Sequence, residues 1–448
     1  LRLKVSLLLV VAALLPLLSV NDYQIRIGCT AALFVMLSLG LNVVVGFVGL
    51  LDLGYVAFYG IGAYTYALLA SSQFNLHCSF WLILPLSIIL TGLFGVLLGF
   101  SSLRLRGDYL AIATLGFGQI ISLLLLNLDR VNLPFLAEPV NLTGGPNGIV
   151  NLDDVRLFGY TISNVSSYYY LILGFLALTF FVVHHLNCSH IGRAWRAIRE
   201  DELAAQAMGL PVPRLKLLAF STGAAVAGAA GALFAAWQGA VFPPNFDITL
   251  VITLYAMIIL GGGGSLLGAI SGAVILSVLP ELLRSTEVAR LLFYSALVLA
   301  VLMYFRRRKV WGLALLACVV LWGWALKTLA MALRPDWFVH PQIEAGTSLY
   351  ALLARAVNAW MLIPHQSKGA GNVVFYVAFG LLLLAYRFKS SVRYALLVPG
   401  LHALAFVWET RLAHEPSITR LILYGAMLVL LMNYRPQGLF GQKRMERT

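Results

Sequence analysis

Four side chains that could bind a metal ion stand close together in the sequence. His184, His185, Cys188 and His190 fall within one short stretch, and imidazole and thiolate groups are common zinc ligands. His184 and His185 are adjacent, however, so they point to different faces of a helix. The four residues are better explained as amphipathic side chains at a helix end. We therefore expect no metal site and no cofactor bound by this chain.

The sequence contains no nucleotide-binding motif of the G-x-x-x-x-G-K-[ST] type. The run Gly261–Ser265 consists of four glycines and a serine without the lysine that holds phosphate, so we expect a tight turn there. His340 and His365 are scattered, and no second catalytic partner lies at a useful spacing. A membrane-embedded enzyme is therefore disfavoured, and we expect no enzymatic activity in this chain.

Several polar residues interrupt or begin long apolar segments. Polar groups in such segments usually face a helix bundle interior or water, or form helix–helix hydrogen bonds. Asp108 is also placed to favour a helix N-terminus. Few of these residues are charged, which suits a neutral or zwitterionic solute. The candidates for lining a solute path are Asn42, Asp52, Asp108, Tyr109, Thr114, Gln119 and Thr222.

The composition indicates the elements that must position these residues. Of 448 residues, 60% are hydrophobic and 11% are charged, against about 25% charged in soluble domains. Apolar blocks of about 16–24 residues recur, and about 20 helical residues cross a membrane. The net charge of +13 is distributed over loops and helix ends, unlike the basic face of a nucleic-acid-binding protein. The chain is predicted to be an all-α, polytopic membrane protein.

Fourteen membrane helices are predicted. Most of the 31 Lys and Arg residues then fall on the side of both termini, which makes that side cytoplasmic. The apolar segment 349–363 is predicted to be interfacial or re-entrant on the outer side, because a further crossing would reverse the later loop charges. The predicted spans are 5–20, 29–48, 54–70, 80–100, 109–128, 167–186, 215–237, 248–260, 265–283, 290–305, 310–332, 371–386, 393–408 and 418–433.

One cytoplasmic segment, Ser189–Leu217, is too polar to cross a membrane. The residues that recur at helical spacing and give one apolar face are Ile191, Trp195, Ile198 and either Ala205 or Leu203. We expect a short amphipathic helix that ends at Gly209, before two prolines. It could lie on lipid or dock a cytoplasmic protein. The acidic residues at 200–202 count against an anionic lipid surface.

This segment also carries a family resemblance. The run GRAWRAIREDELAAQAMG (Gly192–Gly209) resembles the cytoplasmic coupling loop of permeases from ATP-binding-cassette importers. Specifically, the chain resembles the M-type subunit of the branched-chain amino acid permease family over roughly residues 1–285 and 418–440. Further matching motifs follow in the family's order at Gly40–Leu69, Leu105–Ile120, Thr143–Ile149, Leu215–Ala236, Leu260–Leu276, Leu279–Arg284 and Met432–Phe440.

The resemblance implies partners and roles. The amphipathic helix, within 189–214, would sit in a groove of a separate ATPase and convert its closure into helix movement. ATP and Mg²⁺ would be bound by two cytoplasmic ATPases, beside a second homologous permease, an extracytoplasmic binding protein and membrane lipid. The residues implied in ATPase coupling are Gly192, Arg193, Ala197, Arg199, Glu200, Asp201, Ala204 and Gly209.

The chain departs from the family pattern in two places. Gln119 stands where the family usually has Glu, and about 130 residues intervene before the last helix. We therefore expect a permease core of about ten helices, made up of residues 1–285 and the last core helix and tail at 418–448, with an inserted four-helix segment at 286–417 of unknown role.

The expected function is transport of branched-chain or similar amino acids across the cytoplasmic (inner) membrane of a bacterium. Related permeases carry urea and short amides, so these solutes are the alternative. A self-sufficient secondary transporter is a further alternative; it predicts inverted repeats and titratable residues within the membrane. The sequence shows no convincing repeat.

Overall fold

The computed structural model describes most of the chain and divides it into two compact units. Unit 1 comprises Leu1–Val278 and Leu428–Thr448, and unit 2 comprises Leu279–Met427. Each unit is described by itself. The described residues are 12–14, 16, 21–71, 76–102, 105, 107–129, 141–157, 159–282, 286–305, 309–333, 356–357, 360–361, 367–388, 391–414, 425, 429 and 438–441.

The described part of unit 1 is a bundle of apolar helices with short connections. A seven-residue π-helix, η2 (Asn42–Val48), directly continues α2. The polar segment after α6 forms α7 and α8. The helices are α2 (Asp22–Leu41), α3 (Tyr55–Leu69), α4 (Phe80–Ser102), α5 (Asp108–Asn127), α6 (Val165–Cys188), α7 (His190–Glu200), α8 (Glu202–Ala207), α9 (Val212–Gln238), α10 (Ile248–Gly261) and α11 (Leu266–Leu282), with the 3₁₀ turns η3 (Gly145–Asn147) and η4 (Pro243–Phe246).

Seven helical segments of the described part are long and apolar enough to cross a membrane. The predicted spans 5–20 and 418–433 lie almost entirely outside the described residues, as does most of 349–363. The seven candidates are Asp22–Val48, Phe80–Ser101, Asp108–Asn127, Val165–Cys188, Val212–Gln238, Pro243–Gly261 and Val310–Leu333.

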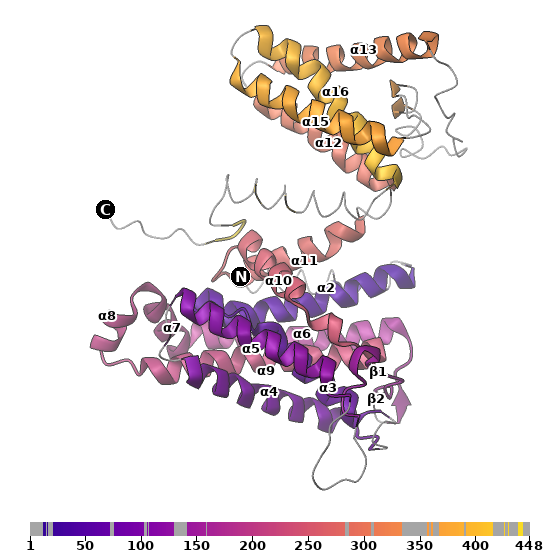
Figure 1. Cartoon of the computed structure of the whole chain (residues 1–448). Coiled ribbons are helices and arrows are strands. Elements are labelled where there is room, and N and C mark those ends of the chain that lie inside the picture. The colour runs from indigo at the N-terminus through magenta and orange to yellow at the C-terminus, as the bar shows by residue number, and fades with distance from the viewer. Residues whose placement is uncertain are drawn as a thin grey trace. The chain divides into compact units, whose positions relative to one another are not determined.

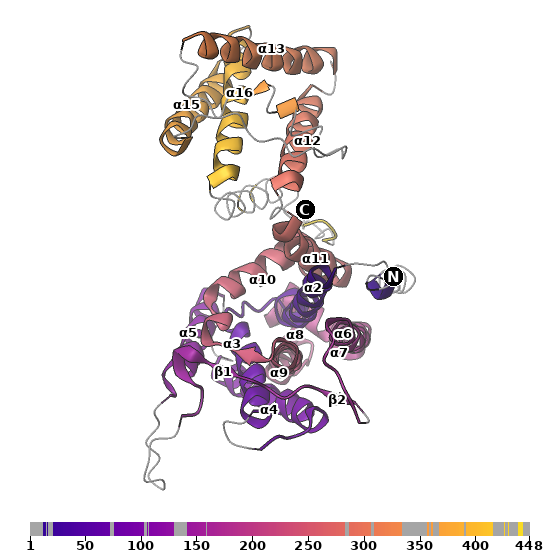
Figure 2. The same cartoon turned by 90° about the vertical axis from the view of Figure 1, so that its right-hand side faces the viewer.

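Small residues let α9 occupy the centre of unit 1. Figure 2 shows α9 among α2, α3, α4 and α6, and it packs against each of them. A Cβ on Gly228 of α9 would collide with Thr91 of α4, and one on Gly62 of α3 would collide with the Gly228 backbone. The Ser87 hydroxyl donates to the carbonyl oxygens of Gly228, at 3.1 Å, and Gly62, at 3.4 Å. These glycines allow the close helix crossings that stabilise bundles in lipid.

The two ends of unit 1 differ in structure. Figure 1 shows α7 and α8 at one end and the short strands at the other. There β1 (Ile149–Val150) pairs antiparallel with β4 (Ala240–Val241), and β2 (Arg156–Leu157) pairs with β3 (Tyr160–Thr161). The Tyr66 hydroxyl donates to the Asp153 carbonyl oxygen at 2.7 Å and ties this end to α3. The end with α7 and α8 is polar and helical, and the opposite end is a set of hydrogen-bonded loops.

The glycine run after α10 forms the expected turn, and residues 438–440 complete it. Helix α10 ends with carbonyl groups that have no partner within the helix. The backbone N–H of Leu439 donates to the Leu260 oxygen, and that of Phe440 donates to the Gly261 oxygen, both at 2.9 Å. Gly438, at φ +77°, lies directly against Gly262. Residues from the Met432–Phe440 motif therefore cap α10.

Unit 2 contains α12 (Thr286–Tyr304), α13 (Lys309–Leu333), α15 (Ser367–Arg387) and α16 (Ser391–His414). The fully buried Glu409 carboxylate accepts hydrogen bonds from Arg290 at 2.8 Å and from Tyr294 at 3.2 Å. This ion pair joins α12 to α16. The indole of Trp360 donates to the Val320 oxygen of α13 at 3.0 Å.

Candidate functional site

The predicted amphipathic helix is two helices, so the prediction of a single helix was wrong. The backbone of Asp201 is extended, and its carboxylate accepts hydrogen bonds from the N–H groups of Leu203 and Ala204 at 3.0 Å. This is an N-cap, which starts a new helix and ends the previous one. Gly209, at φ +83°, follows α8, as expected for a helix C-terminus. We call α7 and α8 together the α7–α8 pair.

The α7–α8 pair is fastened to the start of α9 by two side chains. Trp195 is fully buried, and its indole N–H donates to the Leu215 carbonyl oxygen at 2.9 Å. The ammonium of Lys216, which is 4% exposed, lies 2.7 Å from a Glu202 carboxylate oxygen. Because α9 is the central helix of unit 1, these contacts connect the pair to the middle of the bundle.

Most of the residues implied in coupling lie on the exposed side of the α7–α8 pair. Gly192 is the exception, because it is buried against the end of α6. A Cβ at this position would collide with the carbonyl groups of Leu186 and Asn187. Its role is close packing of α7 on α6. Leu203 and Met208 are 62% and 84% exposed, and neither is among the residues implied in coupling. The exposed residues of the predicted set are Arg193, Ala197, Arg199, Glu200, Asp201, Ala204 and Gly209.

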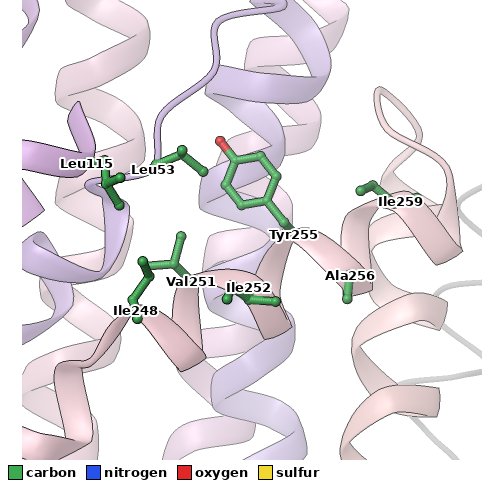
Figure 3. A pocket seen from close by; sticks show the side chains of 8 residues that line it. All are labelled: Leu53, Leu115, Ile248, Val251, Ile252, Tyr255, Ala256 and Ile259. Carbon is green, nitrogen blue, oxygen red and sulfur yellow. The ribbon is translucent and has the colours of Figure 1, made fainter. Parts of the chain in front are cut away.

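An apolar groove lies along α10, next to α5. Its volume is about 420 Å³. Figure 3 shows the Tyr255 hydroxyl directed toward Leu53. This hydroxyl accepts a hydrogen bond from the Asp52 backbone N–H at 2.8 Å. The rest of the lining is aliphatic, so the groove suits an apolar group rather than an ion. The lining residues are Leu53, Leu115, Ile248, Val251, Ile252, Tyr255, Ala256 and Ile259.

Three predicted path residues hold the segments beside this groove. Asp52 is fully buried, and one carboxylate oxygen accepts from the Gly54 N–H at 3.0 Å. The Thr114 hydroxyl oxygen, buried on α5, accepts from the Leu53 N–H at 2.9 Å. Asn42, buried in η2, accepts from the Gly264 N–H at 2.8 Å. These residues position the groove wall without lining the groove.

The other predicted path residues lie elsewhere. Asp108 and Tyr109 are exposed at the start of α5, and Gln119 is half-buried farther along it. The Thr222 hydroxyl donates to the Leu218 and Ala219 carbonyl oxygens of its own helix. Sequence reasoning missed Tyr255, whose only signal was a hydroxyl within the apolar run 248–261.

Within the His–Cys cluster, His184 Nε2 and Cys188 Sγ lie 4.0 Å apart, and the three histidines also contact residues outside the cluster. His184 stacks on Phe180, His185 packs on Phe181, and His190 lies 2.8 Å from Arg193. Within the described residues, no group of three His, Cys, Asp or Glu side chains is arranged to hold a metal ion.

Comparison with known proteins identifies the family. The family model "branched-chain amino acid transport system / permease component" matches residues 25–307, more than half of the chain. The chain belongs to this family. With its apolar helices, it is a multi-pass membrane protein.

Individual relatives agree with the family model. The chain is 41% identical to the high-affinity branched-chain amino acid transport system permease protein LivM of Salmonella typhimurium, over 66% of this chain and 72% of the relative. It is 40% identical to LivM of Escherichia coli over the same shares. It is also 27% identical to permease protein LivH of Salmonella typhimurium, over 62% of this chain and 90% of that relative. No solved structure matches the chain.

The family match extends farther than the resemblance of 1–285 suggested. It continues through α12 to residue 307, and it does not include the C-terminal motif at 432–440. Helices α13, α15 and α16 lie beyond it.

Proposed function

We propose that this chain is a transmembrane permease subunit of an ATP-binding-cassette importer for branched-chain amino acids in a bacterial inner membrane. The match of the family model over residues 25–307 carries the proposal. The urea and short-amide alternative is not favoured, since the family description and the relatives' names specify branched-chain amino acids. In this proposal both termini are cytoplasmic and the chain crosses the membrane about fourteen times.

The α7–α8 pair is the proposed docking site for one of two cytoplasmic ATPases, which would bind ATP and Mg²⁺. Leu203 and Met208 expose large apolar side chains next to exposed charged residues. Such a mixture is typical of a protein interface with an apolar centre and a polar rim. The anchors at Trp195 and Lys216 would transmit a displacement of the pair to α9.

The groove along α10 is the proposed solute path. An aliphatic side chain would lie against Ile252 and Ile259, which are 63% and 40% exposed in the isolated chain. A second, homologous permease would complete the path, as the similarity to both LivM and LivH suggests.

The loop-rich end of unit 1 would receive an extracytoplasmic binding protein. The core expected at 1–285 and 418–448 is extended through α12 in this proposal, because the family match continues to residue 307, and the insertion is then 308–417.

Purification of the tagged chain from its native membrane tests this assignment. We expect an ATPase and a second permease to copurify, and the complex reconstituted in liposomes to take up leucine only when ATP and the binding protein are supplied. Recovery of the chain alone, with leucine flux that does not require ATP, would contradict the proposal and favour a secondary transporter.

A further inference from the structure

Arg199, near the end of α7, reaches into the helix bundle. Its Nη1 donates to the Gly46 carbonyl oxygen of η2, while much of the residue stays exposed. The other two arginines of α7 have local partners: Arg193 lies against His190, and Arg196 donates to Asn187. Arg199 thus connects the α7–α8 pair to a segment about 150 residues earlier in the chain.

Two glycines make room for the Arg199 side chain. A Cβ on Gly49 would lie 3.0 Å from its Cγ, and Gly49 has φ +82°. A Cβ on Gly264, at φ +87°, would collide with its guanidinium and lie 3.0 Å from the Gly46 oxygen. The guanidinium therefore lies at the junction of η2 and the glycine turn after α10. The hydrogen bond from Gly264 to Asn42 joins the same two segments.

Both segments at this junction lead directly to the groove. The loop after η2 contains Asp52, whose N–H donates to the Tyr255 hydroxyl, and Leu53, which lines the groove. The glycine turn begins where α10 ends, and α10 provides most of the groove wall. A movement of the Arg199 guanidinium would therefore act on the groove from two sides.

The η2 segment is suited to such a movement. π-Helical turns are uncommon and frequently occur at functional sites. Conversion of a π turn to an α turn shifts the register by one residue, which gives two discrete arrangements rather than a gradual bend. A planar guanidinium has several donors in fixed geometry, so it can hold a backbone carbonyl in one of these arrangements.

We infer that Arg199 is a positioning residue that couples movement of the α7–α8 pair to the groove, through the Gly46 carbonyl, η2 and the Asp52–Tyr255 contact. This inference rests on the proposed importer function. It assigns Arg199 an inward role, toward the bundle, instead of a contact with the ATPase.

The test uses the complete complex in liposomes and measures leucine transported per ATP hydrolysed. We expect Arg199→Ala to lower this ratio at least tenfold, with the ATPase copurifying in the wild-type amount. Arg199→Lys, which keeps one donor and the charge, should recover part of the ratio. Arg214→Ala, which removes an exposed arginine of α9, is the matched control and should keep the wild-type ratio.

The glycine turn offers a second pair of variants. Gly264→Ala should reproduce the Arg199→Ala defect, because its methyl group would displace the guanidinium. Gly263→Ala, whose Cβ would meet nothing closer than Ile258 at 3.6 Å, should behave as wild type. Tyr255→Phe combined with Arg199→Ala should lower the ratio less than the product of the single effects, since both act through one connection.

The outcomes separate the inference from the proposed function. Wild-type complex without ATP-driven uptake would overturn the proposed function, and the inference with it. Wild-type uptake together with an unchanged ratio in Arg199→Ala would overturn the inference alone. Loss of the ATPase from the Arg199→Ala complex would also overturn it, because Arg199 would then act as a docking residue.

Discussion

Lys216 is a buried ammonium whose charge is balanced by one carboxylate. It is 4% exposed and lies in the first turns of α9, where Glu202 of α8 reaches it at 2.7 Å. A buried charge without a partner costs far more than a neutral side chain in the same place. This ion pair therefore fixes the position of α8 as well as the charge balance of α9.

Glu202→Gln should lower the stability of the purified chain by about 1–3 kcal/mol, because it leaves the Lys216 ammonium without its carboxylate. The melting temperature in detergent measures this change. Adding Lys216→Met to the variant should recover part of the loss, since no buried charge then remains. Glu200→Gln, at an exposed position of α7, is the matched control and should change the stability by less than about 0.5 kcal/mol. Equal melting temperatures for Glu202→Gln and the control would contradict the role assigned to this pair.

Single residues also show why sequence reasoning succeeded at some positions and failed at others. The apolar face with Trp195 and the end at Gly209 are local patterns, and both were predicted. The break at Asp201 was also readable, because Asp is a preferred N-cap, but the spacing of apolar residues on both sides concealed it. The contact between Asn42 and Gly264 joins residues 222 positions apart, and no local pattern specifies its geometry.

At the scale of elements, the break between α7 and α8 depends on the Asp201 cap. Asp201→Ala removes both side-chain hydrogen bonds to the α8 N-terminus and should destabilise α8 by about 0.5–2 kcal/mol. Hydrogen exchange of the amides at 203–208 should become about 2- to 30-fold faster. Asp201→Asn retains an oxygen acceptor, so its exchange should stay near wild type. Unchanged exchange in Asp201→Ala would mean that packing, not the cap, maintains α8.

The crossing of α3, α4 and α9 depends on the absence of side chains at its glycines. The small residues Gly228–Ala232 of α9 lie in this crossing, but their neighbours, Thr91 and Gly62, could not be read from the sequence because they come from other helices. Helix periodicity identifies a small-residue face and leaves the opposing helix unspecified.

Gly228→Val should prevent the correct packing of unit 1, because the added side chain would collide with Thr91. We expect little monodisperse protein by size-exclusion chromatography in detergent. Gly174→Ala in α6 is the control: nothing lies within 4 Å of its Cβ position, so it should be neutral or stabilising by up to about 1 kcal/mol. A monodisperse Gly228→Val protein would contradict the close crossing.

At the scale of the whole molecule, the family match and the two units do not have the same boundaries. The match ends at residue 307, after α12, whereas unit 2 begins at Leu279. One helix of unit 2 thus belongs to the matched region, and α13, α15 and α16 are outside it. We expect transport to depend on unit 1 and α12, and the later helices to be separable from it.

Gly323→Leu tests this separation. Gly323 of α13 contacts Trp360 and His402 so closely that a Cβ would collide with the indole nitrogen. The variant should increase proteolysis within 309–414, while ATP-driven leucine uptake by the reconstituted complex stays within about twofold of wild type. Gly380→Ala in α15, where nothing lies within 4 Å of the Cβ position, should show neither change. A loss of uptake that parallels the proteolysis of Gly323→Leu would show that the later helices take part in transport.

The cap on α10 has a consequence for synthesis of the protein in the cell. Leu439 and Phe440, which bind the Leu260 and Gly261 carbonyl oxygens, are translated about 180 residues after the helix that they complete. At about 5–20 residues per second, this gap corresponds to roughly 10–40 s on the ribosome. During that interval α10 has open carbonyl groups at its end. The C-terminal end of α10 can therefore be capped only after residues 438–440 have been translated. A chain truncated before them would lack these two hydrogen bonds, and its incomplete helix end would be exposed to membrane proteases.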